Sequence, residues 1–177
     1  MKIHLFGASG SGVTTLGHYL AGELNCPYFD SDAFFWELSP VAFTTRRESA
    51  LRNQLLLESL STQKNWILGG SIVNWAIDLP FDLAVFLWLP PAIRLQRLRT
   101  REHQRYGDSI YTDKKRNKLY QEFIDWCAGY DDNTASGRTI KVHEDWMRTL
   151  SCPLLELRGD LSVEERAAKI RLALSFA

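Results

Sequence analysis

The strongest candidate for chemistry is a glycine-rich segment near the start of the chain. Glycine tolerates positive φ angles, so several backbone N–H groups can converge on one anion at the start of a helix. The spacing G-x-x-x-x-G-x-T also places a threonine hydroxyl where a P-loop binds Mg²⁺. We therefore expect a phosphate-binding loop; the alternative is a tight turn that needs glycine only for packing. The segment reads Gly7-Ala8-Ser9-Gly10-Ser11-Gly12-Val13-Thr14-Thr15.

One position departs from the P-loop pattern, because Val13 stands where that pattern has a lysine. The ammonium group would make charge-assisted hydrogen bonds worth roughly 1.5–3 kcal/mol, so its loss weakens nucleotide binding by roughly ten- to a hundred-fold unless another group replaces it. Lys2 is at the other end of the first expected strand, roughly 16 Å away. We expect arginines from elsewhere in the chain to take the place of the lysine.

A pair of carboxylates, Asp30 and Asp32, follows the second expected strand. In an extended chain their side chains point the same way, toward the sheet edge where α/β proteins bind ligands. One carboxylate could hold a water of Mg²⁺, and the other could accept a proton or a hydrogen bond from an acceptor hydroxyl. The alternative is a pair of solvated turn residues, with Asp32 capping a following helical turn.

Arginines recur on one face of the helix expected after the fourth strand. At about 100° per residue they share a stripe about 80° wide, and guanidinium groups there could stabilise charge on a transferring phosphoryl group. We expect Arg97 and Arg101 to do so; a solvated face paired with Glu102 is the alternative. The stripe consists of Arg94, Arg97, Arg101 and Arg105.

Aromatic residues and a glycine pair are candidates for an acceptor pocket. Trp36 follows the two aspartates, and Trp75 follows Gly69 and Gly70. The tryptophans could wall a pocket, while the glycines would let the backbone approach the acceptor. Core packing for the tryptophans and a plain turn for the glycines are the alternatives.

The elements that position these residues alternate between strand and helix. This pattern predicts a three-layer αβα domain with a central five-stranded parallel sheet, and residues 1–177 as a single domain. The polar region from about 106 to 150 is expected to be a helical lid inserted over the sheet. Strands are expected at residues 2–6, 26–30, 65–68, 83–89 and 153–158, and helices at 14–25, 46–64, 92–105, 114–128, 140–150 and 160–176.

Composition limits the classes of partner. The 177 residues are 45% hydrophobic and carry a formal net charge of +0, which disfavours nucleic acid as a partner. The longest apolar run, Leu83 to Pro91, is far shorter than the ~20 residues of a membrane span, so we expect no membrane association. Cys26, Cys127 and Cys152 have neither metal-site nor disulfide spacing, which predicts a cytoplasmic protein.

Taken in order, these motifs resemble those of the P-loop small-molecule and nucleoside monophosphate kinases, the adenylate kinase and shikimate kinase group. The bacterial adenylate kinase-like (topology-modulation-like) P-loop proteins are the most similar branch. The resemblance implies that Asp30 lies on the metal side, that Asp32 lies on the acceptor side and that Arg97 and Arg101 are lid arginines. It also implies that Arg46 or Arg47 holds a phosphate of the acceptor; the alternative is a surface pair. The resemblance is carried by GASGSGVTT, Tyr28-Phe29-Asp30-Ser31-Asp32, Gly69-Gly70 and Arg97-x-x-x-Arg101.

The function expected from residues and resemblance is an ATP-dependent phosphotransferase. It would use ATP and Mg²⁺, with Thr14 and Asp30 on the metal, and would phosphorylate a small molecule or a nucleoside monophosphate. The alternative is a nucleotide-binding regulatory protein with little or no turnover, which Val13 supports.

Overall fold

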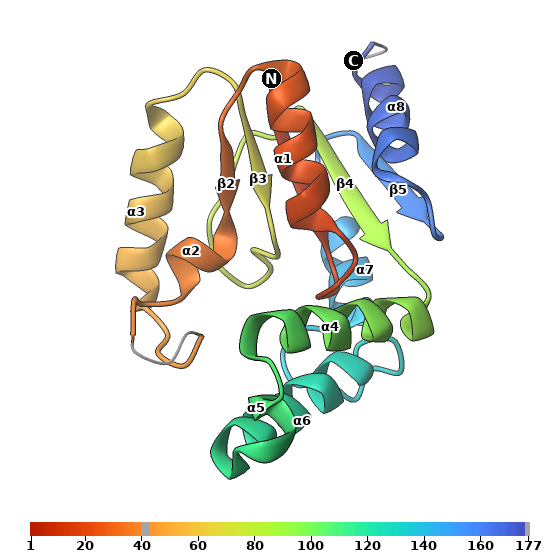
Figure 1. Ribbon diagram of the computed structural model, residues 1–177. Helices are drawn as coiled ribbons and strands as arrows, with labels where there is room; N and C mark the ends of the chain where they lie inside the picture. Colours follow the sequence, from red (N-terminus) through yellow and green to blue (C-terminus); the bar gives the residue numbers. More distant parts are fainter. Residues whose placement is uncertain (40–42, 176–177) are drawn as a thin grey trace.

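The central element is a single parallel sheet with strand order β2-β3-β1-β4-β5. The computed structural model describes residues 1–39 and 43–175 (Figure 1). The five-stranded parallel sheet expected from the sequence is confirmed, and each expected strand has its counterpart. The strands are β1 (Lys2–Gly7), β2 (Tyr28–Asp30), β3 (Trp66–Gly69), β4 (Leu83–Trp88) and β5 (Leu154–Arg158).

Helices cover both faces of the sheet, so the α/β three-layer architecture is also confirmed (Figure 1). The helix at 114–128 has its expected bounds. The helices expected to begin at residues 46 and 160 begin at Ser49 and Val163 instead, because Glu48 and Ser162 cap them. Phe176, where the last helix was expected to end, lies outside the described residues. The helices are α1 (Val13–Leu24), α2 (Ser31–Phe35), α3 (Ser49–Ser61), α4 (Pro91–Tyr106), α5 (Ser109–Thr112), α6 (Lys114–Ala128), α7 (Ile140–Met147) and α8 (Val163–Leu174).

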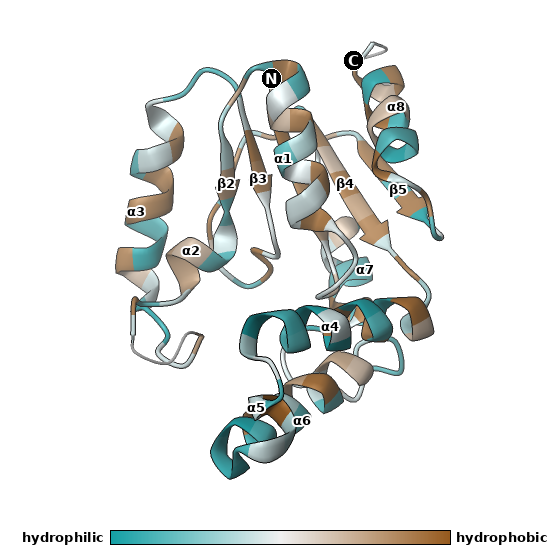
Figure 2. Cartoon of the chain, in the orientation of Figure 1, coloured by the Kyte–Doolittle hydropathy of each residue, from teal (hydrophilic) through white to brown (hydrophobic). Residues whose placement is uncertain are grey.

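Alternation along the central strands divides the core into two faces. On one face, Ile3 and Leu5 of β1 pack with Leu16 of α1 and Ile170 of α8. On the other face, Phe6 and neighbouring β4 residues pack with α7, while α3 covers β3. Figure 2 shows the apolar sides of these elements facing inward and the polar sides facing outward. The sheet is therefore rigid, and its carboxyl edge can hold side chains in fixed positions.

The expected lid region divides into two parts. Helices α4, α5 and α6 extend beyond the carboxyl edge of the sheet (Figure 1) and share a hydrophobic cluster that includes Leu98, Tyr120 and Cys127. Helix α7 instead packs on the sheet through Met147. Within the described residues, no helix has both the length and the apolar character needed to cross a membrane.

Candidate functional site

The loop between β1 and α1 has the backbone of an anion cradle. Gly10 and Gly12 have φ angles of 85° and 96°, and α1 begins directly afterwards, at Val13. A Cβ on Gly10 would lie 2.9 Å from Leu98 Cγ and 3.0 Å from the Arg94 carbonyl oxygen, so α4 packs tightly on the loop. The first amides of a helix have no intrahelical acceptor, and they face the space enclosed by this loop.

Three arginines from distant parts of the chain contact this loop. Arg94 Nη1 donates to the Ser9 carbonyl oxygen at 3.3 Å, and Arg166 Nη1 donates to the Ser11 carbonyl oxygen at 2.7 Å. Arg138 Nη2 donates to the Ser9 hydroxyl oxygen at 3.1 Å. The loop is therefore surrounded by positive charge even though it lacks the usual lysine.

The arginine stripe expected on one helix face does not act as a unit. Arg94 is buried and pairs with Asp131 at 2.7 Å, which makes it part of the scaffold. Arg97 pairs with Asp160 at 2.7 Å, and Arg101 lies 3.5 Å from Glu102. The Arg97–Asp160 pair is exposed on both sides, so it costs little to break when a nucleotide binds, whereas the Arg101–Glu102 pair includes a buried carboxylate. Arg105 points to Glu102 at 3.7 Å and stays remote from the loop.

Asp30 ties the end of β2 to the loop and to α2. Its Oδ1 accepts from the Asp32 backbone N–H at 2.9 Å, so Asp30 is the N-cap of α2. Its Oδ2 accepts from Thr14 Oγ1 at 3.3 Å and from the Tyr28 hydroxyl at 3.5 Å. The extended geometry expected for the two aspartates is wrong, because the chain becomes helical at Ser31. The alternative, in which Asp32 caps the following turn, is also wrong, because Asp30 is the cap.

Thr14 and Asp30 provide oxygen donors of the kind that Mg²⁺ prefers. Their side-chain oxygens are 3.3 Å apart at the start of α1. In the described part of the chain, no three His, Cys, Asp or Glu residues form a metal-binding group. A magnesium ion that arrives with nucleotide phosphates fits this arrangement, because the phosphate oxygens and waters supply its other ligands.

Asp32 occupies a strongly charged environment. Its side chain reaches solvent, yet surrounding protein desolvates the carboxylate and raises its pKa. Arg138 opposes this shift, Asp30 adds to it, and Arg101 and a hydrogen bond from Trp36 oppose it further. The raised pKa shows that desolvation exceeds the attraction of the two arginines, which suits a group that accepts a proton.

Gly69 and Gly70 both lie against side chains of β2 and α2. The ring of Tyr28 fills the space beside Gly69, where a Cβ would overlap with the hydroxyl oxygen. Gly70 has a φ of 96°, and Ser31 Oγ occupies the place of its missing Cβ. This contact brings the turn after β3 against the residue that precedes Asp32. Acceptor binding by Gly69, Gly70 and Trp36 stays a prediction.

A buried cation that the sequence reasoning missed lies near α2. Arg52 is 6% exposed, and its guanidinium carbon lies 4.1 Å from the ring centre of Trp75 and 5.9 Å from that of Phe35. Desolvation lowers its pKa, and within residues 1–39 and 43–175 it forms no ion pair. Arg47, considered earlier, instead donates to the Phe34 carbonyl oxygen at 2.6 Å.

Arg138 was also missed, since it lies in an irregular segment before α7 and not on a periodic helix face. Its guanidinium lies over Trp126 at 5.0 Å. The only sequence signal was an arginine next to Thr139, the N-cap of the expected helix.

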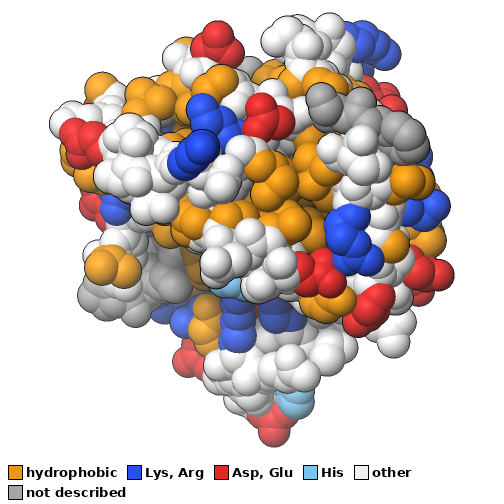
Figure 3. Space-filling view, turned by 90° about the horizontal axis from the view of Figure 1, so that it is seen from above, with side chains coloured by type: hydrophobic (Ala, Val, Ile, Leu, Met, Phe, Trp, Pro, Cys, Tyr) orange, Lys and Arg blue, Asp and Glu red, His pale blue; other side chains and the backbone are white. Residues whose placement is uncertain are grey.

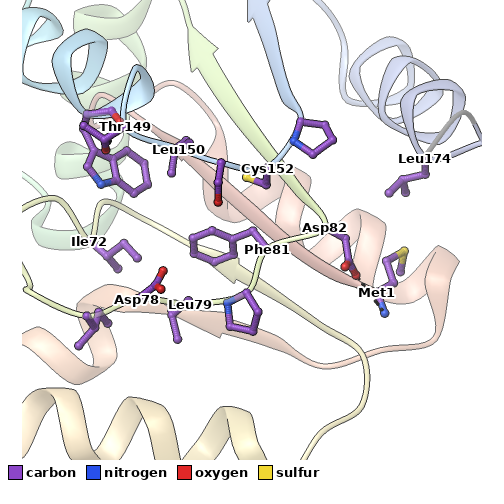
Figure 4. Close-up of a pocket in the computed structure, with 15 residues that line it drawn as sticks. Met1, Ile72, Asp78, Leu79, Phe81, Asp82, Thr149, Leu150, Cys152 and Leu174 are labelled. Atoms are coloured by element: carbon purple, nitrogen blue, oxygen red, sulfur yellow. Dashed lines mark hydrogen bonds and ion pairs between the residues drawn. The ribbon is translucent and has the colours of Figure 1, made fainter.

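A separate groove of about 1060 Å³ starts at Ile72, after the turn that follows β3, and runs toward the amino end of the sheet (Figure 4). It runs between Ile72–Asp82 and Trp146–Pro153, beside the amino ends of β1, β4 and β5. Figure 3 shows this end of the molecule, where hydrophobic side chains gather between charged ones. The groove exists because the connection from β3 to β4 contains no helix to cover this face. Its position separates it from the phosphate loop.

The chain has the fold of the P-loop kinase group. Deoxyadenosine kinase from M. mycoides with bound dATP aligns with a TM-score of 0.60 at 13% identity, covering 99% of this chain and 100% of that one. Shikimate kinase from Bacteroides thetaiotaomicron aligns with a TM-score of 0.55 at 21% identity, covering 99% and 98%. A cytidylate kinase of Saccharolobus islandicus is 25% identical over 77% of this chain and 78% of its own length.

Within this group, the chain belongs to the family of the uncharacterized protein YqaC of Bacillus subtilis. The two sequences are 40% identical over 171 residues, which cover 96% of this chain and 94% of YqaC. A shikimate kinase of Alteromonas mediterranea is 29% identical over 76% of this chain and 90% of its own. No protein-family profile matches the chain.

Proposed function

We propose that this protein is an ATP-dependent phosphotransferase that moves the γ-phosphoryl group of Mg·ATP to a small anionic acceptor. The observation that carries the proposal is the position of Arg138, which donates to Ser9 in the loop and acts electrostatically on Asp32. One cation thereby acts both on the phosphate loop and on Asp32, the carboxylate expected to face the acceptor. In this proposal residues 1–177 act as one domain, with α4 to α6 closing over the nucleotide.

The nucleotide would be held mainly by backbone groups. The amides from Gly10 to Thr14 would surround the β-phosphate, and the hydroxyls of Ser9 and Thr15 would assist them. The hydroxyl of Ser11 is buried beside Gly7, so Ser11 would contribute through its backbone. Thr14 would bind Mg²⁺, with Asp30 holding one of its waters. The metal ion would neutralise charge on the phosphates when bound. Gly7 is required because a Cβ there would overlap with the Leu87 carbonyl oxygen.

Arginines would replace the missing lysine. Arg138 reaches the loop from the side of Asp32, and Arg97 and Arg101 come from α4. These guanidinium groups would stabilise charge on the transferring phosphoryl group. A phosphate can displace the partly exposed serine and aspartate partners of Arg138 and Arg97, whereas Glu102, the partner of Arg101, is buried.

The acceptor would bind between Asp32 and the turn after β3. Asp32 would orient the attacking hydroxyl and accept its proton, while Trp36 and the backbone at Gly69 and Gly70 would line the site. Arg52 supports an anionic acceptor, because this buried guanidinium donates to Asn53 and is attracted by Glu48 but forms no ion pair within the described residues.

The test is to follow ADP release from Mg·ATP with a panel of nucleoside monophosphates and hydroxy acids. We expect turnover with at least one anionic acceptor, and its loss in Asp32→Ala and Arg138→Ala. Asp78→Ala is a matched control, since Asp78 lies in the distant groove. Absence of heat on titration with ATP, ADP and phosphate would contradict the proposal.

A second candidate is a regulatory protein that binds a nucleotide without turning it over. The side chain of Val13 packs against the hydrophobic core and carries no charge to the phosphates. Tight ADP binding together with no ADP release for any acceptor would favour this candidate.

A further inference from the structure

His143 lies in a buried chain of hydrogen bonds that ends beside the proposed acceptor site. Its Nδ1 is 2.7 Å from the Tyr130 hydroxyl oxygen, and its Nε2 is 3.0 Å from Ser71 Oγ. His143 is 0% exposed and Tyr130 is 3% exposed. Ser71 directly follows Gly70, which contacts Ser31 next to Asp32. The chain thus connects the end of α6 with the turn after β3.

The direction of these hydrogen bonds follows from counting protons. Within the described residues, His143 Nδ1 is the one hydrogen-bond partner of the buried Tyr130 hydroxyl, so this hydroxyl must donate to it or leave its proton unpaired. Burial lowers the pKa of His143 to about 3, so the ring is neutral and carries one proton. With Nδ1 accepting, that proton is on Nε2, which donates to Ser71 Oγ.

Because Ser71 accepts from His143, its own proton is available to another partner. Ser71 is half-buried, and His143 is its one side-chain partner in the described part of the chain. If Nε2 of His143 carried no proton, the Ser71 hydroxyl would instead donate to the imidazole and its proton would point inward. The neutral imidazole is enclosed by Phe6 and Phe86, whose ring centres lie 5.4 and 5.9 Å away, so the ring cannot turn to exchange its nitrogens.

We propose that Ser71 recognises the acceptor by donating a hydrogen bond to it, and that Tyr130 and His143 are positioning residues that turn its hydroxyl proton outward. This inference rests on the proposed phosphotransferase function. It predicts that the acceptor presents a hydrogen-bond acceptor atom, an oxygen or an unprotonated ring nitrogen, toward the turn after Gly70. An acceptor that presents only an N–H or O–H donor there could not accept this proton and would bind more weakly.

The first test observes the tautomer and requires no turnover. In protein labelled with ¹⁵N-histidine, with the His143 signals assigned by their loss in His143→Phe, we expect protonated Nε2 and bare Nδ1 from pH 5 to pH 9. A protonated Nδ1, or titration within this range, would overturn the proposal. This result does not depend on whether any acceptor is phosphorylated. Failure of the proposed function can therefore be distinguished from failure of the proposed hydrogen-bond chain from Tyr130 to Ser71.

The second test measures the KM for the acceptor. Ser71→Ala should raise it about tenfold, with kcat and the KM for ATP nearly unchanged. The double variant Tyr130→Phe/His143→Phe leaves no buried polar atom unpaired along the chain and keeps Ser71. It should raise the acceptor KM about threefold, because the hydroxyl then rotates freely.

A triple variant separates positioning from a structural role. If Tyr130 and His143 act through Ser71, adding their substitutions to Ser71→Ala should produce no further rise in KM. Additive effects would contradict the proposal. Tyr120→Phe is the matched control, since it removes another buried phenol hydroxyl in the separate cluster of α4 to α6.

Discussion

Arg138 Nη2 lies 3.1 Å from the Ser9 hydroxyl oxygen, although 129 positions separate the two residues. The contact delivers a guanidinium to the phosphate loop from the segment that precedes α7. The same arginine is the largest favourable charge on Asp32. The loop therefore has a cation beside it, although it lacks the usual lysine.

Replacement of Arg138 should impair turnover more than nucleotide binding. We expect Arg138→Ala to lower kcat at least about 100-fold, because a guanidinium that stabilises a transferring phosphoryl group contributes more in the transition state than in the ground state. Arg138→Lys should recover only part of this loss. Steady-state ADP release measures kcat, and calorimetry with ADP measures binding. Arg148→Ala, which breaks an exposed pair with Asp145, is the control; equal losses in both variants would contradict the assignment.

Introducing the missing lysine should not improve the protein. Val13 is half-buried against the core, and Arg138 and Arg166 already surround the loop. We expect Val13→Lys to leave kcat unchanged or lower, and to reduce the melting temperature by a few degrees as packing is lost. Val13→Leu controls for the change in size. A tenfold or greater rise in kcat would show that the arginines do not replace the lysine.

The raised pKa of Asp32 predicts how stability depends on pH. A carboxyl whose pKa is higher in the folded chain than its ordinary value of 3.8 loses stability as pH rises through the folded value, because the folded state holds the proton more tightly. Asp32→Asn should therefore melt about 1–3 °C higher than the wild type at pH 7, where solvent exposure keeps the effect small. Below pH 3.5 the two should melt alike.

The control for this comparison is Asp78→Asn, an exposed carboxylate in the distant groove. It should melt as the wild type does at both pH values. A wild type more stable than Asp32→Asn at pH 7 would mean that Arg138 and Arg101 outweigh desolvation at Asp32. Differential scanning calorimetry at the two pH values decides between these outcomes.

Two glycines form a notch for the ring of Tyr28. A Cβ on Gly17 or on Gly69 would overlap with ring atoms, so each alanine variant should lower the free energy of unfolding by about 1–3 kcal/mol in urea titrations. Gly22→Ala is the matched control: nothing lies within 4 Å of its Cβ position on the same helix, so it should stabilise the protein by about 0.5–1 kcal/mol.

The variant Tyr28→Ala separates steric overlap from a backbone effect. In that background Gly17→Ala and Gly69→Ala should cost far less, because the ring that they displace is gone. Equal costs with and without the ring would contradict the notch. The contact matters for the site because the Tyr28 hydroxyl and Thr14 meet at the same oxygen of Asp30.

The local parts of this protein were determined by the sequence itself. The buried runs at β1 and β4 predict central parallel strands, since a strand covered on both faces must be apolar throughout. The loop from Gly7 to Thr15 is equally local, because its positive φ angles at Gly10 and Gly12 depend on the residues present at those positions. The parallel sheet and the position of the glycine loop could therefore be predicted without a structure, whereas the strand order and the conformation after Asp30 could not.

The charges and hydrogen bonds that complete the site were decided only by the tertiary structure. Arg138, Arg166 and Arg52 have no spacing signal, because a long side chain can reach a site from any backbone that happens to pass nearby. Helical periodicity placed Arg94 with Arg97 and Arg101, yet packing of α4 on the loop buried it against Asp131. Periodicity identifies which residues share a helix face, whereas the partner of that face depends on how distant segments pack.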